Sequence, residues 1–340
     1  MNGLQKRRKE TIGVFLGVAV AVFIATVVSV CVGKYSISIE DILAILGGSD
    51  EVSVMSRKVF FTLRLPRTFM AILAGAGLGL AGSVYQIIFK NPLASPDIIG
   101  IAGGANLGAA VAIVSVSSSG MIGIAMGSFV GGFLAVLGVM LLVKVTRSRS
   151  TATYVLAGIV INAISKAFIM GLKYFADPEN ELAAMEYWEM GTLGNTTASK
   201  VMAIFPMFFV GFAGLLLLRR QIELLSLGDN ECRALGMRLR LVRTIILLLS
   251  TLLVASVISI TGLISFAGLI APHISRLALK RNNSLTMCLS GLMGALVVLA
   301  ADILARLIYS TELPISILTT VIGVPLLIYF LCERGKERVI

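Results

Sequence analysis

The sequence predicts an all-helical protein that crosses a membrane many times. Of its 340 residues, 57% are apolar and only 14% are charged, whereas soluble globular domains carry about 25% charged residues. Apolar runs long enough for a spanning helix, about 20 residues, recur along the whole chain between short polar islands. These observations exclude an ordinary cytosolic enzyme, a disordered tail and a secreted scaffold held by disulfides.

Ten apolar segments are expected to span the membrane. In chain order they cover residues 11–33, 68–89, 98–116, 120–143, 152–172, 198–218, 242–261, 263–279, 286–308 and 314–332. The first segment is too long for the core of a signal peptide, so we expect it to remain as a span. The eighth segment is short and contains Pro272, a pattern that also fits a re-entrant helix.

The positions of Lys and Arg favour a crossing by the eighth segment. With ten spans and a cytosolic N-terminus, 20 of the 29 basic residues lie inside, and without that crossing only 15 do. The positive-inside bias therefore predicts ten spans with both termini in the cytosol. Residues 1–340 then form a single transmembrane domain, whose largest inner loop, about 219–241, is strongly basic. The net charge of +11 reflects these islands rather than a face that binds nucleic acid.

Glycines recur four residues apart in several predicted spans. The pairs are Gly75 with Gly79, Gly100 with Gly104, Gly104 with Gly108, Gly123 with Gly127, and Gly127 with Gly131. Small residues at this spacing allow helices to approach closely in lipid. The pattern predicts a tightly packed bundle and carries no information about a substrate.

The sequence offers little chemistry of its own. It has no G-x-x-x-x-G-K-[ST] phosphate loop, and its single histidine, His273, is not part of a zinc-protease motif. The four cysteines form no C-x-x-C pair, so neither a metal site nor a disulfide framework is indicated. We therefore expect no enzymatic activity, no metal and no cofactor.

Ionisable groups inside the predicted spans are few. Asp302 is the main carboxylate, whereas an ion-coupled secondary transporter usually buries several near the membrane midplane. Lys166 is the only ionisable group deep in an apolar segment. It is either a cation on the path of an anionic solute or a long side chain that reaches back to the membrane surface. Many spans with no energy source of their own indicate a permease driven by a separate ATPase.

A series of motifs in fixed order supports this interpretation. They are RLPR at 64–67, NPLASPD at 91–97, GGANLGA at 103–109, LAGIVINA at 156–163, WEMG at 188–191, FAGLIAPH at 266–273, ADILAR at 301–306, ELP at 312–314 and GVP at 323–325. From about residue 60 onward, the chain resembles the permease subunits of ABC importers for iron–siderophore, haem and vitamin B12, the FecCD-type, BtuC-like family.

This resemblance implies a ten-span BtuC-like fold and a place in the bacterial cytoplasmic membrane. It also implies three protein partners: a second permease copy or a related permease, a cytosolic ABC ATPase dimer that binds the ATP, and an extracytoplasmic solute-binding protein. Membrane lipid surrounds the chain, and no nucleic acid is expected. A ferric siderophore is the first expectation for the cargo, with haem or vitamin B12 as the alternative. An ion-coupled secondary transporter is the rival from another class.

The resemblance also assigns functional positions. The segment that couples to the ATPase contains Gly228, Asp229, Glu231, Cys232, Arg233, Ala234, Leu235 and Gly236. Docking of the binding protein falls to Arg64, Arg67 and Arg306, which lie at the outer surface in the predicted topology. Arginine suits this role because its planar fork binds carboxylates bidentately. The cytosolic gate and pathway set consists of Asn91, Leu93, Ser150, Thr151 and Lys166.

The chain departs from the family pattern at a few positions. Cys232 stands where alanine is usual, and Asn282 and Asn283 replace a common Asp-His pair. Ser316 replaces a glycine that usually follows the Glu-Leu-Pro motif. Because none of these positions belongs to a proposed contact with a partner except Cys232, we expect only local changes of loop geometry, and Cys232 is itself small and apolar.

Overall fold

The computed structural model describes residues 2–49, 52–115, 120–147, 150–308 and 312–337. All regular structure in these ranges is helical. The α-helices are α1 (Asn2–Cys31), α2 (Ile39–Leu46), α3 (Val54–Val59), α4 (Leu65–Ile88), α5 (Ile101–Ser115), α6 (Gly120–Val145), α7 (Thr151–Phe175), α8 (Ala183–Met190), α9 (Ala198–Leu217), α10 (Arg219–Leu224), α11 (Asp229–Ala234), α12 (Leu239–Thr261), α13 (Ala267–Leu279), α14 (Ser284–Leu307) and α15 (Ile315–Glu337). Short π-helices η1 (Phe60–Arg64) and η3 (Pro178–Leu182) and a 3₁₀-helix η2 (Pro96–Ile99) complete the set.

Seven helical stretches in the described ranges are long and apolar enough to cross a membrane. They are Gln5–Cys31, Val54–Ile88, Met121–Val145, Thr151–Phe175, Ala198–Leu217, Leu239–Thr261 and Ser284–Leu307. Each overlaps one of the predicted spans, and the second begins at Val54 rather than at residue 68. The third, eighth and tenth predicted spans fall instead on α5, α13 and α15, whose apolar stretches are shorter.

The segment that precedes α4 is more ordered than the sequence suggested. Residues 34–67, which separate the first two predicted spans, contain α2, α3, η1 and the first residues of α4. Ser53 caps α3 by accepting a hydrogen bond from the Ser56 amide at 3.0 Å. The stretch Val54–Ile88 then runs on for 35 residues without a break. At 1.5 Å per residue it is about 52 Å long, well beyond the ~30 Å of a hydrocarbon core.

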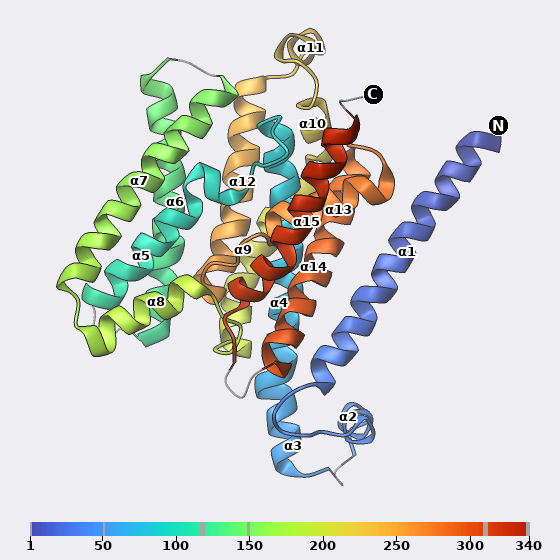
Figure 1. The fold of residues 1–340 in the computed structure, drawn as a ribbon, viewed down its shortest axis with the longest axis vertical. Helices are drawn as coiled ribbons and strands as arrows, with labels where there is room; N and C mark the ends of the chain where they lie inside the picture. Colours follow the sequence, from blue (N-terminus) through green and yellow to red (C-terminus); the bar gives the residue numbers. More distant parts are fainter. Residues whose placement is uncertain (1, 50–51, 116–119, 148–149, 309–311, 338–340) are drawn as a thin grey trace.

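The helices run between two ends of the molecule (Figure 1). The start of α1, the end of α15 and the short helix α11 lie at one end, called here the α11 end. Helices α2 and α3 protrude at the opposite end, called here the α2 end. Helices α5, α6 and α7 gather on one side, while α1 stands on the other side, away from them.

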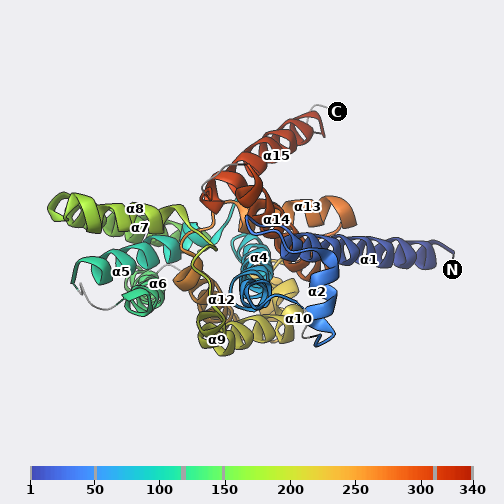
Figure 2. The same ribbon diagram turned by 90° about the horizontal axis from the view of Figure 1, so that it is seen from below.

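Helix α4 occupies the centre of the bundle. Seen along its axis, it lies between α12, α9 and α14 (Figure 2). Its contact with α14 depends on small residues: a Cβ on Gly75 would overlap the backbone of Gly294, and one on Gly79 would overlap Ser290. These two backbones therefore touch directly, which side chains at either position would prevent.

The contact between α5 and α6 repeats the same device. A Cβ on Gly104 would overlap Gly131, and one on Gly108 would overlap Gly127. Three of the glycine pairs that the sequence pointed out, 75/79, 104/108 and 127/131, therefore lie in close helix contacts. The prediction of a bundle packed through small residues is confirmed for these helices.

Substitution of Gly79 tests this packing. We expect Gly79→Ala to lower the stability of the purified protein in detergent by about 1–3 kcal/mol, because the added methyl group overpacks the α4–α14 contact. The matched control is Gly17→Ala in α1, where no neighbouring atom lies within 4 Å of the new methyl group. Alanine favours helix over glycine by up to about 1 kcal/mol, so this variant is expected to keep or gain stability. Equal thermal shifts for both variants would contradict the close approach.

Candidate functional site

The α11 end carries a short helical projection made of α10 and α11. Glycines bound α11 on both sides, and Gly236 adopts a φ of +77°, a left-handed conformation that ends the helix without steric cost. Asp229 and Glu231 lie in the first turn, where carboxylates interact favourably with the helix dipole.

Cys232 points inward, toward α10. Its side chain is fully buried, and its Sγ donates to the carbonyl of Leu224 at 3.0 Å. Burial raises the pKa of the Cys232 thiol and so favours its neutral form. The outward face consists of charged and small residues together with Leu235, which is 62% exposed. Cys232 therefore packs α11 against α10, and Leu235 is the exposed apolar side chain at the end of α11.

Three polar contacts tie this projection to the rest of the bundle. Asp229 pairs with Arg243 of α12 at 3.2 Å. Glu223 of α10 accepts a hydrogen bond from the backbone N–H of Ser284, the first residue of α14, at 3.2 Å. Lys90, just after α4, donates to the carbonyl of Leu227. The projection is thus bonded to α12, to the start of α14 and to the end of α4.

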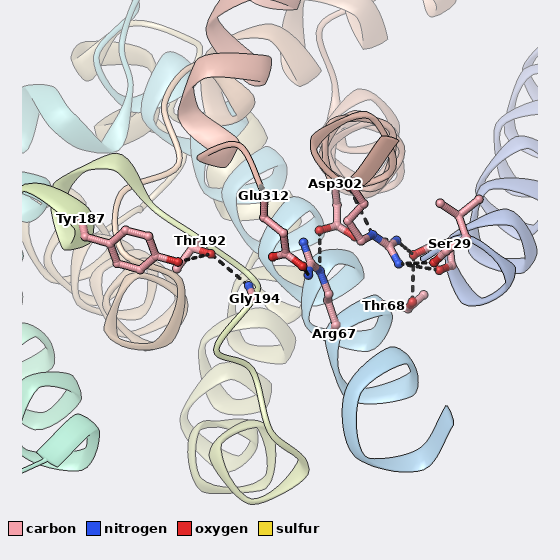
Figure 3. Close-up of polar contacts among 10 residues, drawn as sticks. Ser29, Arg67, Thr68, Tyr187, Thr192, Gly194, Asp302 and Glu312 are labelled. Carbon is pink, nitrogen blue, oxygen red and sulfur yellow. Dashed lines mark hydrogen bonds and ion pairs between the residues drawn. The ribbon is translucent and has the colours of Figure 1, made fainter. Parts of the chain in front are cut away.

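The α2 end carries a network of buried ions, shown in Figure 3. Asp302 of α14 is fully buried and binds Arg67 of α4 through Oδ1 and Arg306 through Oδ2, each at 2.8 Å. Glu312 points at Arg67 from the other side, with Oε1 2.8 Å from Nη1. Arg306 also donates to the Ser29 hydroxyl at 2.7 Å, which brings α1 into the network.

Arg64 is the third arginine at this end, and it has no carboxylate partner among the described residues. Its guanidinium group donates to the backbone carbonyls of Val30 and Cys31, each at 2.7 Å, and to that of Tyr35. The arginine side chains expected at the outer surface are therefore turned into the protein: Arg64 is only 4% exposed and Arg67 only 8%.

The sequence did not assign Glu312 to any site, and it singled out Asp302 only as an isolated charge. These two residues lie 245 and 235 positions beyond Arg67. The sequence contained one indication of this pairing: Asp302 in the ADILAR motif and Glu312 in the ELP motif both lie close to Arg306 along the chain. A cavity of about 350 Å³ lies beside the network, and its charged lining comprises Lys34, Arg64, Arg67, Arg306 and Glu312.

A larger cavity of about 620 Å³ lies against α7. Its polar lining includes Asn106, Asn162 and Lys166, and its apolar lining includes Leu93. Asn162 and Lys166 are four residues apart, so they share one face of α7. Near the α2 end of that face, Lys173 pairs with Glu186 at 2.8 Å and Glu189 at 2.9 Å.

The structure brings together only part of the predicted pathway set. Leu93 and Lys166 line the 620 Å³ cavity, whereas Asn91 lines a separate cavity of about 270 Å³. Asn91 also accepts a hydrogen bond from the Leu93 amide at 2.9 Å, which fixes the turn between them. Ser150 caps α7 by accepting from the Thr153 amide, and neither it nor Thr151 lines these two cavities. Among the described residues, no cluster of His, Cys, Asp or Glu is placed to hold a metal ion.

Removal of the Asp302 charge tests the buried network. We expect Asp302→Asn to cost about 3–5 kcal/mol of stability, because two buried guanidinium groups lose their shared anion. The control Glu186→Gln removes a partly exposed partner of Lys173 and is expected to cost ~1 kcal/mol or less. Both are measured by unfolding of the purified protein in detergent. Similar losses for the two variants would show that Asp302 is not the anion on which the network depends.

Comparison with known proteins places this geometry in a family. Residues 21–333 match the FecCD transport family. The molybdate import permease MolB of Haemophilus influenzae is 34% identical over 96% of this chain and 98% of its own length. The Fe(3+)-citrate import permease YfmE of Bacillus subtilis is 32% identical over 99% of this chain and 100% of its own length.

A solved structure, described as an inward-facing conformation of an ABC transporter of the metal-chelate type, has the same fold. It shares 31% identity with this chain, and the match covers 96% of this chain and 99% of that one with a TM-score of 0.83. The chain is therefore a multi-pass membrane permease, and it belongs to the FecCD transport family.

Proposed function

We propose that the chain is the permease subunit of an ATP-driven importer that carries an iron chelate across the bacterial cytoplasmic membrane. The observation that carries this proposal is the charged projection made of α10, α11 and the residues beside them, which presents the exposed Leu235 at the end of α11. The projection is bonded to α12 through Asp229, to α14 through Glu223 and to the end of α4 through Leu227. An exposed apolar side chain on such a projection suits a protein partner. The bonds behind it give that partner a mechanical connection to the long helices.

In this proposal the chain is one transmembrane domain with ten spans, and α5, α13 and α15 supply the three that are short. The α11 end then faces the cytosol together with both termini, in agreement with the positive-inside bias of the sequence. The α2 end faces outward. Figure 1 supports this topology, because α1 begins and α15 ends at the end that bears α11.

The partners follow from the two ends. A cytosolic ABC ATPase dimer receives α11 and binds the ATP, so the permease needs no cofactor or metal of its own and catalyses no covalent step. A solute-binding protein docks at the α2 end, where Lys34, Arg64, Arg67 and Arg306 line one cavity and favour acidic side chains. A second permease copy, or a related permease, completes the pathway along the exposed face of α7.

The cargo is proposed from the 620 Å³ cavity. Lys166 lines it and makes no ion pair within the described part of the chain, and Asn106 and Asn162 add amide groups. These groups suit the oxygen-rich surface of an anionic iron chelate such as a ferric siderophore. Haem and vitamin B12 are alternatives of similar bulk, and molybdate is a further candidate because MolB is among the relatives.

The rival class, an ion-coupled secondary transporter, needs a carboxylate that can exchange its ion during transport. Asp302 is the main carboxylate in the predicted spans, and both of its oxygens are held by arginines at 2.8 Å. The charge of this carboxylate is already balanced by two arginines, which leaves it poorly suited to bind a travelling cation.

Reconstituted transport tests the function directly. Proteoliposomes that contain the permease and its ATPase are expected to accumulate radiolabelled ferric siderophore when the loaded binding protein is outside and ATP is on the α11 side. Accumulation is expected to survive an uncoupler and to stop without the ATPase. Parallel assays with haem, cobalamin and molybdate identify the cargo. Uptake that needs no ATPase and collapses with the uncoupler would refute the proposal.

A charge placed on α11 tests the docking of the ATPase. We expect Leu235→Arg to weaken binding of the ATPase by about tenfold or more, since buried apolar anchors dominate protein interfaces. The control is Leu46→Arg on α2, a leucine that is 66% exposed, comparable to the 62% of Leu235, but lies at the opposite end. Binding of purified ATPase to each variant in detergent is the measurement. Equal affinity for both variants would move the docking site away from α11.

A further inference from the structure

Glu312 is the outermost member of the buried ion network. It pairs with Arg67 at 2.8 Å, but its side chain is 36% exposed, whereas the other partner of Arg67, Asp302, is fully buried. Exposed ion pairs contribute little stability, while buried ones are costly to break. Arg67 therefore has one permanent partner and one that an incoming acid can replace.

The surroundings of Glu312 favour such an exchange. Three arginines, Arg64, Arg67 and Arg306, lie beside only two carboxylates. Among the described residues Arg64 donates to backbone carbonyls and pairs with neither acid. The 350 Å³ cavity beside them thus carries an excess of positive charge, to which Lys34 adds. Gly194 leaves room for Glu312 in its present position, since a methyl group at that residue would come within 2.6 Å of Oε2.

Glu312 also begins a short connection to the large cavity, residues 312–316, called here the strap. Two backbone hydrogen bonds hold the strap: the Leu313 amide donates to the carbonyl of Ala305 at 3.3 Å, and the Ile315 amide donates to the carbonyl of Gly191 at 3.1 Å. The Ser316 hydroxyl donates to the carbonyl of Leu263 at 2.7 Å and accepts from the Ser265 amide at 3.2 Å.

The two residues that Ser316 holds belong to the wall of the 620 Å³ cavity. They lie in the link between α12 and α13, which has left-handed backbone at both ends, at Gly262 (φ +66°) and Phe266 (φ +63°). Residues 263–265 of this link lie outside the helices, and the Ser316 hydroxyl supplies two hydrogen bonds to them that a glycine at position 316 could not.

We infer that Glu312 is the exchangeable acid of the docking cavity, and that the strap carries its exchange to the wall of the large cavity through Ser316. An acidic side chain of the docked binding protein takes the place of Glu312 on Arg67. Once Glu312 has left Arg67, the strap can move, and the hydrogen bonds of Ser316 to Leu263 and Ser265 weaken. Docking at the α2 end therefore makes the wall of the large cavity more mobile. This inference rests on the proposed function, and it makes Ser316 a positioning residue rather than a contact for cargo.

The first test needs no partner. Amide hydrogen exchange of the purified chain in detergent is expected to speed up at Ser265 by about fivefold in Ser316→Ala, the equivalent of one lost hydrogen bond of ~1 kcal/mol. Glu312→Gln is expected to speed it up by a smaller factor. Thr320→Val is the control, because this hydroxyl lies one turn further along α15 and makes no hydrogen bond to any residue in the described ranges. Unchanged exchange at Ser265 in Ser316→Ala would overturn the inference, whatever the transport assay shows.

The second test uses the complete transporter. Glu312→Gln is expected to tighten binding of the binding protein by up to about fivefold, because a competing surface ion pair is lost, yet to reduce the stimulation of ATP hydrolysis by that protein. Gly194→Ala displaces the same carboxylate by size and is expected to act in the same direction. Ser316→Ala is expected to reduce stimulation at unchanged affinity, and Ser316→Thr, which keeps the hydroxyl, to restore it.

The outcomes separate the inference from the proposed function. Weaker binding in Glu312→Gln, or full stimulation in Ser316→Ala, would overturn the exchange. A general loss of folding would lower both the affinity for the binding protein and the stimulation of ATP hydrolysis. Glu312→Gln is instead expected to raise the affinity and lower the stimulation, so the two explanations are distinguishable. If the wild-type transporter showed no stimulation by any binding protein, the proposed function would fail, and hydrogen exchange at Ser265 would still decide the role of the strap.

Discussion

The direct backbone contact between α4 and α14 is the constraint on which the rest of the molecule depends. Apolar side chains are as favourable in contact with lipid tails as with protein. Helices therefore associate only where they pack more closely against each other than against lipid. Gly75, Gly79 and Gly294 create such a place. The paired helices then set both ends of the molecule: α14 begins at the Ser284 amide that Glu223 binds and carries Asp302 near its other end, beside Arg67 of α4.

Much of this architecture could be predicted from the sequence. The parts that could not be predicted share one physical origin. Helical class, seven spans and the close glycine contacts follow from local patterns of hydropathy and spacing. The helices α2 and α3 lie between the first two predicted spans, where Arg57, Lys58 and their neighbours interrupt the apolar runs on which span prediction relies. Their burial comes from packing against each other and against the end of α1, which a one-dimensional pattern does not reveal.

The arginines illustrate a different limit. Their type and position suggested an outward-facing set, but charge alone does not tell whether a guanidinium group faces water or a buried acid. Its partners Asp302 and Glu312 lie more than two hundred residues away in sequence. Cys232 is a second case, at the other end: the sequence shows only that its side chain is small and apolar, whereas the fold buries it against α10 with its Sγ bonded to the carbonyl of Leu224. Lys166 fell into a cavity that no local pattern could delimit.

The unbroken helix from Val54 to Ile88 has a consequence for how a soluble protein meets this one. A rod of about 52 Å is longer than a hydrocarbon layer of ~30 Å, so several of its turns lie outside that layer. Together with α2, those turns form a pedestal (Figure 1). The turns outside the hydrocarbon layer expose helix surface where water-soluble groups can reach it, so the length of this one helix makes part of a transmembrane segment accessible from the aqueous side.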